Sequence, residues 1–180
     1  MQDARDTFYV TLRTRLAAIN PDRTIVLRGQ LRPGVLVEEN ELPTAFQPVD
    51  AFSLHWTAMA VDASSPLPLV AMECQISYAT DGNAGNGGMD RGRLLTAMDG
   101  ELASALLAAP QSALKKNFSP VAGTGTVAGT AAPAVPMATN IFWSAPRFAP
   151  VTTAGERLER VATVQVFSFQ EPADQEAAEL

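Results

Sequence analysis

The segment Leu69-Val70-Ala71-Met72-Glu73-Cys74-Gln75-Ile76-Ser77-Tyr78-Ala79 alternates large apolar residues with small or polar ones. Side chains along a β-strand point to opposite faces in turn, so a period of two predicts a strand with one buried face. The residues predicted to be buried are Val70, Met72, Cys74, Ile76 and Tyr78. This is the most regular strand pattern in the chain, and the other elements are placed relative to it.

The segments on either side predict a second strand and a helix. Residues 52–61 predict a strand that carries five residues on one side: Phe52, Leu54, Trp56, Ala58 and Ala60. A turn over residues 64–68 follows it. After the central strand, a glycine-rich loop (residues 81–88) leads to a helix with Asp90 as its N-cap, and Pro110 ends this helix. The apolar stripe of the helix comprises Leu94, Leu95, Met98, Leu102, Ala105, Leu106 and Ala109.

The N-terminal part predicts one amphipathic helix and two short strands. Residues 3–19 form the helix, which ends at Asn20-Pro21, and its apolar face comprises Phe8, Leu12, Leu16 and Ile19. The strands are predicted over residues 24–29 and 35–38, with a turn-like break between Gly29 and Gly34. The acidic residues that follow, up to position 43, predict an exposed loop.

The C-terminal part begins with an unusual segment. Residues 119–140 contain no charged side chain and are rich in Gly, Ala, Thr and Pro. Such a length without regular structure is uncommon inside a compact domain, and we interpret the segment as an arm that orders against a partner. Strands are predicted over residues 141–148 and 160–170, the second of them central or covered on both sides because both of its faces carry apolar groups. Residues 171–180 form an acidic tail that we expect to be flexible.

This order of elements favours an α+β fold over a doubly wound one. Runs of strands between helices are typical of a mostly antiparallel sheet, here flanked by two main helices. The length of 180 residues corresponds to about one domain. We therefore predict a single domain over residues 1–170, with a long loop or arm at 119–140.

Composition and charge exclude several classes of protein. The net charge of −6 disfavours nucleic-acid binding, and no apolar run is long enough to cross a membrane. The polar, mixed-charge residues 1–6 do not resemble a signal peptide. Cys74 is the single cysteine, so an intramolecular disulfide is impossible and a reducing compartment is favoured. With one His and one Cys, a zinc site is not expected, and we predict neither a metal nor a cofactor.

Each candidate chemical site has a simpler structural explanation. The glycine-rich loop lacks the Gly-Lys-Ser/Thr ending of a phosphate-binding loop, and Asp90 would repel phosphate. His55 and Trp56 point to opposite faces of a strand, without a nucleophile motif beside them. Cys74 is predicted to be a buried, unreactive thiol. The acidic group Glu38, Glu39 and Glu41 lacks the spacing of a calcium loop, and Lys115-Lys116, predicted at a helix exit, is too small a basic cluster for nucleic acid.

Two groups of residues are candidates for contacts between subunits. Arg91 and Arg93, in Asp90-Arg91-Gly92-Arg93, lie at the start of the second long helix. Arg91 and Asp99 are eight residues apart, so they share a helix face without touching, and the simpler interpretation is a solvated helix face with partial ion pairing. The uncharged segment supplies small apolar candidates, namely Val121, Val127, Val135 and Met137.

The order of elements resembles the tail terminator and neck proteins of tailed bacteriophages and related phage-like particles. The similarity runs from the helix over residues 3–19 through Val70–Tyr78 and the Asp90-Arg91-Gly92-Arg93 helix start to Val164-Gln165-Val166-Phe167-Ser168-Phe169. In that family, a strand similar to Ile76-Ser77-Tyr78 leads through a loop into a helix that begins near an Asp-Arg pair. The segment over residues 119–140 is longer than the core of the family needs, which marks an added arm.

The resemblance implies a structural, non-enzymatic protein of the virion, assembled in the host cytoplasm. Such a protein forms a ring of identical subunits, expected to be a hexamer, at the end of the tail tube. Its implied partners are the tail tube protein and a neck or head-completion protein, and DNA can pass through the ring without sequence-specific binding.

The residues by themselves leave two other functions open. One is a non-catalytic ligand-binding or chaperone-like module. The other is a small enzyme that uses Glu73, Asp81 or Asp90 as an acid or a base. An enzyme would require these carboxylates to converge with other polar groups in a pocket.

Overall fold

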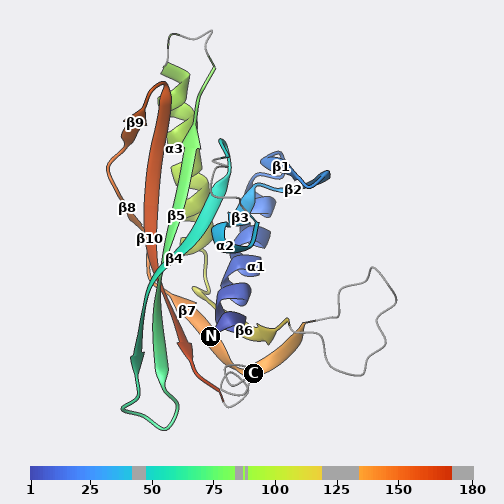
Figure 1. Ribbon diagram of the computed structural model, residues 1–180, viewed down its shortest axis with the longest axis vertical. Helices are drawn as coiled ribbons and strands as arrows, with labels where there is room; N and C mark the ends of the chain where they lie inside the picture. Colours follow the sequence, from blue (N-terminus) through green and yellow to red (C-terminus); the bar gives the residue numbers. More distant parts are fainter. Residues whose placement is uncertain (42–47, 84–86, 88, 119–133, 172–180) are drawn as a thin grey trace.

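A computed structural model describes residues 1–41, 48–83, 87, 89–118 and 134–171. Three helices and ten strands follow one another along this part of the chain (Figure 1). The helices are α1 (Gln2–Ile19), α2 (Glu38–Glu41) and α3 (Met89–Leu107). The strands are β1 (Thr24–Leu27), β2 (Gln30–Pro33), β3 (Val35–Val37), β4 (Phe52–Asp62), β5 (Leu69–Thr80), β6 (Ser112–Asn117), β7 (Val135–Trp143), β8 (Arg147–Phe148), β9 (Thr152–Ala154) and β10 (Arg157–Phe169).

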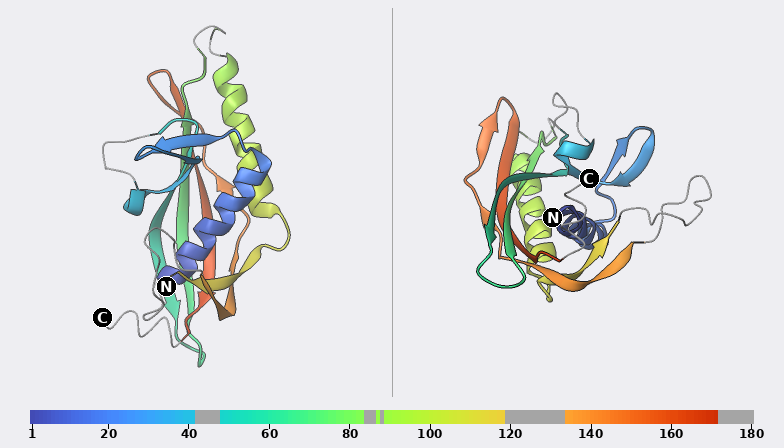
Figure 2. Two further views of the ribbon diagram at one scale, coloured as in Figure 1. Left: turned by 90° about the vertical axis from the view of Figure 1, so that its right-hand side faces the viewer. Right: turned by 60° about the horizontal axis from the view of Figure 1, so that its bottom comes forward.

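The fold belongs to the α+β class, and its main sheet is almost entirely antiparallel, as the sequence predicts. Its strands lie in the order β3-β4-β5-β10-β7-β6, with β8 and β9 added on the β7 side of β10, and β3 is parallel to β4. A separate hairpin consists of β1 and β2. The main sheet curls around α1 and α3, so both long helices lie on its concave side (Figure 2). The two helices thus cover one face of the sheet instead of lying on opposite faces.

The long central pair β5–β10 confirms the strand predictions. The register runs without interruption from Leu69 opposite Phe169 to Thr80 opposite Leu158. The predicted alternation in β5 is observed, since its five large apolar residues are all buried. Residues directly opposite one another share a face, so the buried side of β10 consists of Ala162, Val164 and Val166, with Ser168 at its end. β10 is central, as predicted.

The core joins both helices to this buried face. Phe8 of α1 packs edge-on against Trp56 of β4 and Trp143 of β7, with ring centroids 5.9 and 5.6 Å apart. Such edge-to-face pairs add to the free energy of burial. Three residues assigned to apolar helix faces are instead exposed: Ile19 (44%), Leu94 (42%) and Ala109, which lies beyond the end of α3. Ile19 is the last residue of α1.

The structure corrects two predictions in the N-terminal half. The break between Gly29 and Gly34 contains a strand, β2, which pairs with β1 through a two-residue turn at Arg28 and Gly29. Both turn residues have positive φ, as a tight hairpin of this type requires. The predicted acidic loop begins with the short helix α2, and its Glu41 pairs with Arg32 of β2.

Four further corrections concern the C-terminal half. Lys115 and Lys116 belong to a strand, β6, where sequence reasoning placed a helix exit. The uncharged segment becomes a strand earlier than predicted, because β7 begins at Val135 and pairs with β6. The strand predicted over residues 141–148 is interrupted, since β7 ends at Trp143 and β8 starts at Arg147. Glu171, predicted to be the first residue of the flexible tail, is buried.

Buried Lys115 explains how β6 joins the end of β10. Its Nζ donates to the carbonyl of Phe169 over 2.7 Å and lies 3.5 Å from a carboxylate oxygen of Glu171. The same carboxylate accepts the backbone N–H of Thr139 over 2.8 Å and that of Ala138 over 3.2 Å. A buried charge needs such partners, so this network fixes the lower end of the sheet.

No helix in the described part of the chain is both long and apolar enough to cross a membrane.

Candidate interaction surface

The free edge of the main sheet is the most distinctive surface of the molecule. β3 pairs with β4 over Phe52–Leu54, and beyond that point the described residues supply no further strand on this side of β4. His55 is contacted by α2, with its Nδ1 3.2 Å from a Glu38 carboxylate oxygen. The remaining residues, 57–62, are here called the free β4 edge. The outward backbone groups of an unpaired edge form a template for another strand.

A β-bulge gives this edge apolar side chains on its concave side. The register shifts between Trp56 and Ala58, so that Met59 lies opposite Met72 and Val61 opposite Val70. Met72 and Val70 are buried, and their partners on β4 therefore share the core-facing side of the sheet. The prediction that Ala58 and Ala60 occupy this side was wrong, because the bulge exchanges the two faces.

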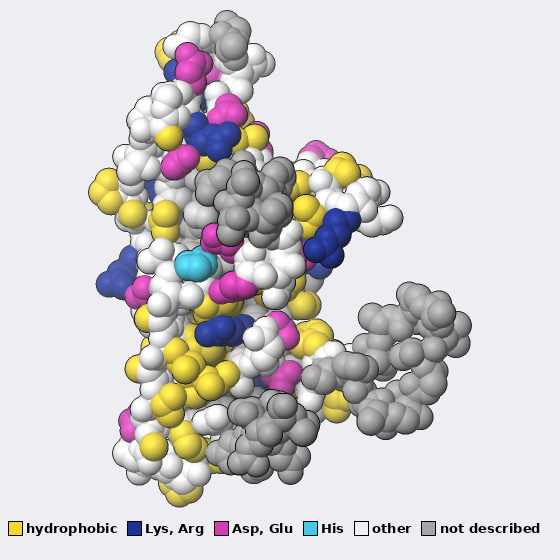
Figure 3. All heavy atoms as spheres, viewed as in Figure 1, with side chains coloured by type: hydrophobic (Ala, Val, Ile, Leu, Met, Phe, Trp, Pro, Cys, Tyr) yellow, Lys and Arg dark blue, Asp and Glu magenta, His cyan; other side chains and the backbone are white. Residues whose placement is uncertain are grey.

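Met59 and Val61 remain half exposed despite facing the core side. Their exposed fractions are 47% and 50%, and Leu67 in the connecting turn is 43% exposed. The β4–β5 hairpin that carries them extends beyond the N-terminal end of α1, so the helix does not cover them (Figure 1). Hydrophobic side chains gather over the lower part of this face, beside the hairpin (Figure 3). A concentration of apolar surface at an unpaired edge is typical of a protein–protein contact.

The opposite edge of the sheet is closed by α1. The hydroxyl oxygen of Thr7 accepts the backbone N–H of Lys116 in β6 over 3.0 Å and donates to the carbonyl of Asp3 over 2.6 Å. Thr7 is 2% exposed, so this contact excludes water from the edge. A helix laid along an edge strand prevents pairing with other chains. The contrast with the free β4 edge is therefore built into the fold.

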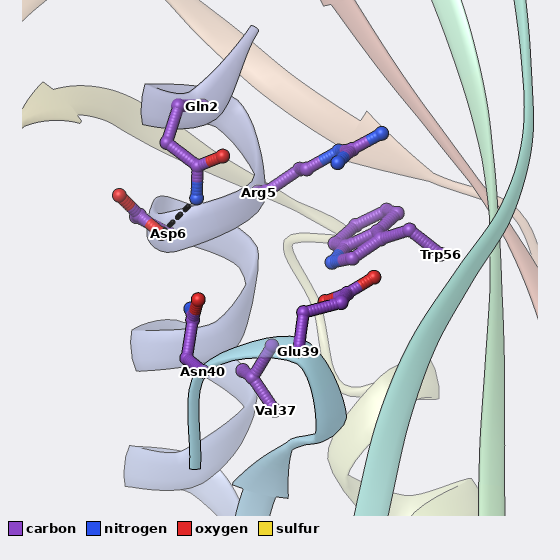
Figure 4. A pocket seen from close by; sticks show the side chains of 7 residues that line it. All are labelled: Gln2, Arg5, Asp6, Val37, Glu39, Asn40 and Trp56. Atoms are coloured by element: carbon purple, nitrogen blue, oxygen red, sulfur yellow. Dashed lines mark hydrogen bonds between the residues drawn. The ribbon is translucent and has the colours of Figure 1, made fainter. Parts of the chain in front are cut away.

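A small pocket lies where β4 leaves the core, between α1 and α2 (Figure 4). Its volume is about 130 Å³, and it is lined by Gln2, Arg5, Asp6, Val37, Glu39, Asn40 and Trp56. The Arg5 guanidinium lies over the Trp56 ring, 5.3 Å from its centroid, and Gln2 donates to Asp6 over 2.8 Å. Burial raises the pKa of Asp6. A space this small fits one side chain, whereas pockets for small ligands are typically about 300 Å³ or larger.

The pocket brings together residues that sequence analysis did not connect. They come from four elements that the fold places side by side, namely the first turns of α1, the end of β3, the short helix α2 and the middle of β4. The helical spacing of Gln2, Arg5 and Asp6 predicts a shared face. Nothing in the sequence indicates that Trp56 and Glu39 lie opposite this face.

The predicted contact residues at the start of α3 have separate environments. Arg91 is half-buried and donates through Nη1 to the carbonyl of Glu156, whereas Arg93 is exposed. Asp90 lies inside the first turn of α3, since the helix begins at Met89, and it accepts the backbone N–H of Asn83. The N-cap precedes the first helical residue, so the N-cap prediction for Asp90 was two positions off. Asp99 on the same helix pairs with Arg160 over 3.0 Å.

The candidates from the uncharged segment are only partly described. Val135, opposite Asn117 in the β6–β7 pair, is exposed, and Met137 of the same strand is half-buried. Val121 and Val127 lie outside the described residues. Val135 and Met137 of β7 are therefore accessible where the strand follows the uncharged residues 119–133.

Glu73 and Asp81, two of the three carboxylates considered for catalysis, lie apart. Glu73 accepts hydrogen bonds from Thr57 over 2.8 Å and from Gln165 over 3.0 Å. Glu73 belongs to β5, and Asp81 follows the last residue of that strand and pairs with Arg157 over 2.8 Å. Eight residues of extended chain separate Glu73 from Asp81, which corresponds to roughly 26 Å. The geometry does not bring these groups together around one substrate.

The single cysteine and the acidic residues offer little for metal or redox chemistry. Cys74 is buried, and burial raises the pKa of its thiol, which disfavours the reactive thiolate. Among the described residues, no three His, Cys, Asp or Glu side chains converge as a metal site requires. Glu41 is bound to Arg32 and Glu38 faces His55, so the acidic group is divided between separate partners.

Comparison of the sequence with protein-family models and with curated proteins found no match.

Proposed function

We propose that the chain is a structural subunit that assembles into a ring at the end of a tail tube of a bacteriophage or phage-like particle. The observation that carries the proposal is the free β4 edge, with half-exposed Met59 and Val61 beside it. Such an edge is an aggregation hazard unless a partner covers it. A protein that functions inside an assembly has such a partner.

The type of assembly follows from the resemblance described above and from the charge of the chain. The resembling family caps tail tubes with rings, and we expect a hexamer that contacts the tail tube protein and a neck or head-completion protein. The net charge of −6 suits a ring through which DNA passes without sticking. In this proposal the protein is located at the end of the tail and has no catalytic role.

The uncharged segment supplies the test of this proposal. Residues 135–140 of the uncharged segment belong to β7, so only residues 119–133 are replaced in the test. We expect its replacement by a short Gly-Ser link to leave the fold intact, as judged by urea unfolding, and to abolish ring formation with the tail tube protein. A Gly-Ser replacement of exposed residues 150–151, in the connection between β8 and β9 and away from β6, β7 and the free β4 edge, is the control for changing a loop. Unchanged ring formation without residues 119–133 would contradict the role of the arm.

A further inference from the structure

We propose that the free β4 edge receives residues of the 119–133 segment from a neighbouring copy of this chain, as an added β-strand. The inference rests on the proposed ring and specifies how one subunit would hold the next. It names the acceptor, residues 57–62 of β4, and the occupant, a segment of the same chain in another subunit.

The chemistry of the two partners is complementary. Residues 57–61 read Thr-Ala-Met-Ala-Val, and residues 119–133 read SPVAGTGTVAGTAAP. Apart from Asp62 at the end of the acceptor, neither stretch contains a charge, in a chain of which 18% of the residues are charged. Strand addition gains affinity from backbone hydrogen bonds, and the small side chains of the segment allow close approach to Met59 and Val61.

The distribution of proline in the segment fits a paired strand. Pro120 and Pro133 lie at its ends, so every residue from 121 to 132 retains a backbone N–H. Thr124, Thr126, Val127 and Thr130 add β-branched side chains, which favour extended structure. The backbone N–H groups in the interior of the segment can therefore donate hydrogen bonds to the carbonyls of β4.

The positions of the two partners favour a head-to-tail contact. The segment leaves β6 after Asn117 and returns to β7 at Val135, on the side of the molecule opposite the β4–β5 hairpin (Figures 1 and 2). A ring of identical subunits needs two different surfaces on opposite sides of each copy. Seven extended residues reach roughly 23 Å, so half of the 15-residue segment can cross to a neighbour.

The sheet edges near the segment's own base are already occupied. Thr7 of α1 closes the β6 edge at Lys116. Glu171 binds the backbone N–H groups of Ala138 and Thr139 on the other side of β7. The strand-like segment thus has no adjacent edge to join at these positions, whereas the free β4 edge retains its outward backbone groups.

Disulfide trapping tests the contact directly. Ala60→Cys in β4 is combined in turn with Thr124→Cys, Gly125→Cys, Thr126→Cys and Val127→Cys, and each variant is oxidised after assembly with the tail tube protein. Cys74 is buried and does not compete. We expect at least one pair to give a reducible ladder of covalent oligomers. The matched control places the edge cysteine at Thr153, an exposed residue of β9, and should give at least tenfold less cross-linked product.

Charge at the edge provides an independent readout. The double variant Met59→Lys, Val61→Lys should reduce the fraction of protein in rings at least tenfold without changing the urea midpoint, because both side chains are half exposed. Val26→Lys, Leu31→Lys removes two other exposed apolar residues, on the β1–β2 hairpin, and should leave the ring fraction unchanged.

The outcomes separate this inference from the proposed function. Rings that form with the unmodified chain, but without cross-links between residue 60 and the segment, would overturn the inference alone. Cross-links formed only within one chain, or undiminished rings with the edge lysines, would do the same. A failure of the unmodified chain to form a ring with the tail tube protein would overturn both.

Discussion

Arg15 illustrates how single side chains hold the two long helices together. Its guanidinium extends from α1 to the end of α3 and donates to the carbonyls of Ala105, Ala108 and Pro110 over 3.0, 3.0 and 2.7 Å. It also lies over the ring of Trp143, 5.0 Å from the centroid. The last carbonyls of a helix lack partners within the helix, and the Arg15 guanidinium provides hydrogen-bond donors for them from the neighbouring helix.

The exchange Arg15→Ala should therefore destabilise the fold by about 2 kcal/mol, since hydrogen bonds from a charged donor are lost together with an aromatic contact. Arg15→Lys should recover less than half of this loss, because an ammonium group cannot reproduce the planar fork. Urea unfolding measures both variants. Arg13→Ala is the control: Arg13 is on the same helix, 5.9 Å from the Tyr9 ring centroid, and we expect a change below about 0.5 kcal/mol. An equal loss for the two alanine variants would contradict this role of Arg15.

Glu171 makes stability depend on pH. Burial raises the pKa of its carboxyl group, but hydrogen bonds from Thr139 and Ala138 and the nearby Lys115 outweigh burial, so the pKa lies below its ordinary value of 4.5. A depressed folded-state pKa contributes stability that is fully present above the unfolded value and is lost as the pH falls through the folded one. The carboxylate therefore stabilises the fold at neutral pH.

We expect Glu171→Gln to lower the free energy of unfolding at pH 7, and the difference from the unmodified chain to shrink as the pH falls below 4.5. Urea titrations at a series of pH values measure the difference. Glu156→Gln, at an exposed residue of the turn before β10, should retain the pH dependence of the unmodified chain. A difference for Glu171→Gln that stays constant down to pH 3 would show that its carboxylate charge is not the source.

At the scale of elements, α1 protects one edge of the sheet through Thr7. We expect Thr7→Val, which keeps the shape of the side chain, to cost about 1.5 kcal/mol, because the buried N–H of Lys116 loses its acceptor. It should also speed hydrogen exchange at Lys116. Thr14→Val is a matched control on the same helix, since the Thr14 hydroxyl is exposed and binds only the carbonyl of Val10. Protection of the Lys116 amide that survives in Thr7→Val would contradict the closing role of Thr7.

Periodicity predicted the elements whose burial is regular along their length. The strand β5, the strand β10 and both long helices carry apolar residues at the spacing of their own geometry, and each was placed within a few residues of its ends. The α+β class and the central place of β10 followed from this pattern. These elements form the core, so local pattern and tertiary burial coincide there.

The elements that were missed depend on partners far away in the sequence. The pair Lys115-Lys116 does not look like a strand, because Lys115 can be buried only where Phe169 and Glu171 provide acceptors. Pro136 made the start of β7 resemble a loop, because proline is uncommon within strands, although it is tolerated near a strand end. The glycine at position 29 was a usable signal for the β1–β2 hairpin, since a tight turn favours positive φ there.

The candidate surface was the least predictable feature. A single bulge between Trp56 and Ala58 brings Met59 and Val61 to the core-facing side, and no residue type marks it in the sequence. That β4 lacks a neighbour beyond Leu54 follows from the short length of β3. The uncharged composition of residues 119–133, in contrast, was visible from the sequence alone and pointed to a partner before any partner surface was known.

For the whole molecule, the curled sheet produces two unlike sides. One side carries the free β4 edge on a hairpin that extends past the core, and the other carries the base of the uncharged segment (Figures 1 and 2). Subunits with two such surfaces join head to tail, and the rotation between neighbours decides whether the chain of subunits closes. A closed ring is the form in which every free edge is covered.

The mass of the assembled species tests this account most directly. The purified chain, of 19.1 kDa, is mixed with its tail tube protein, and the complexes are weighed by native mass spectrometry. We expect one discrete closed oligomer of this chain, with six copies, that is lost when Met59 and Val61 are both replaced by lysine and retained when Val26 and Leu31 are. A chain that stays monomeric both alone and in its native particle would contradict the ring.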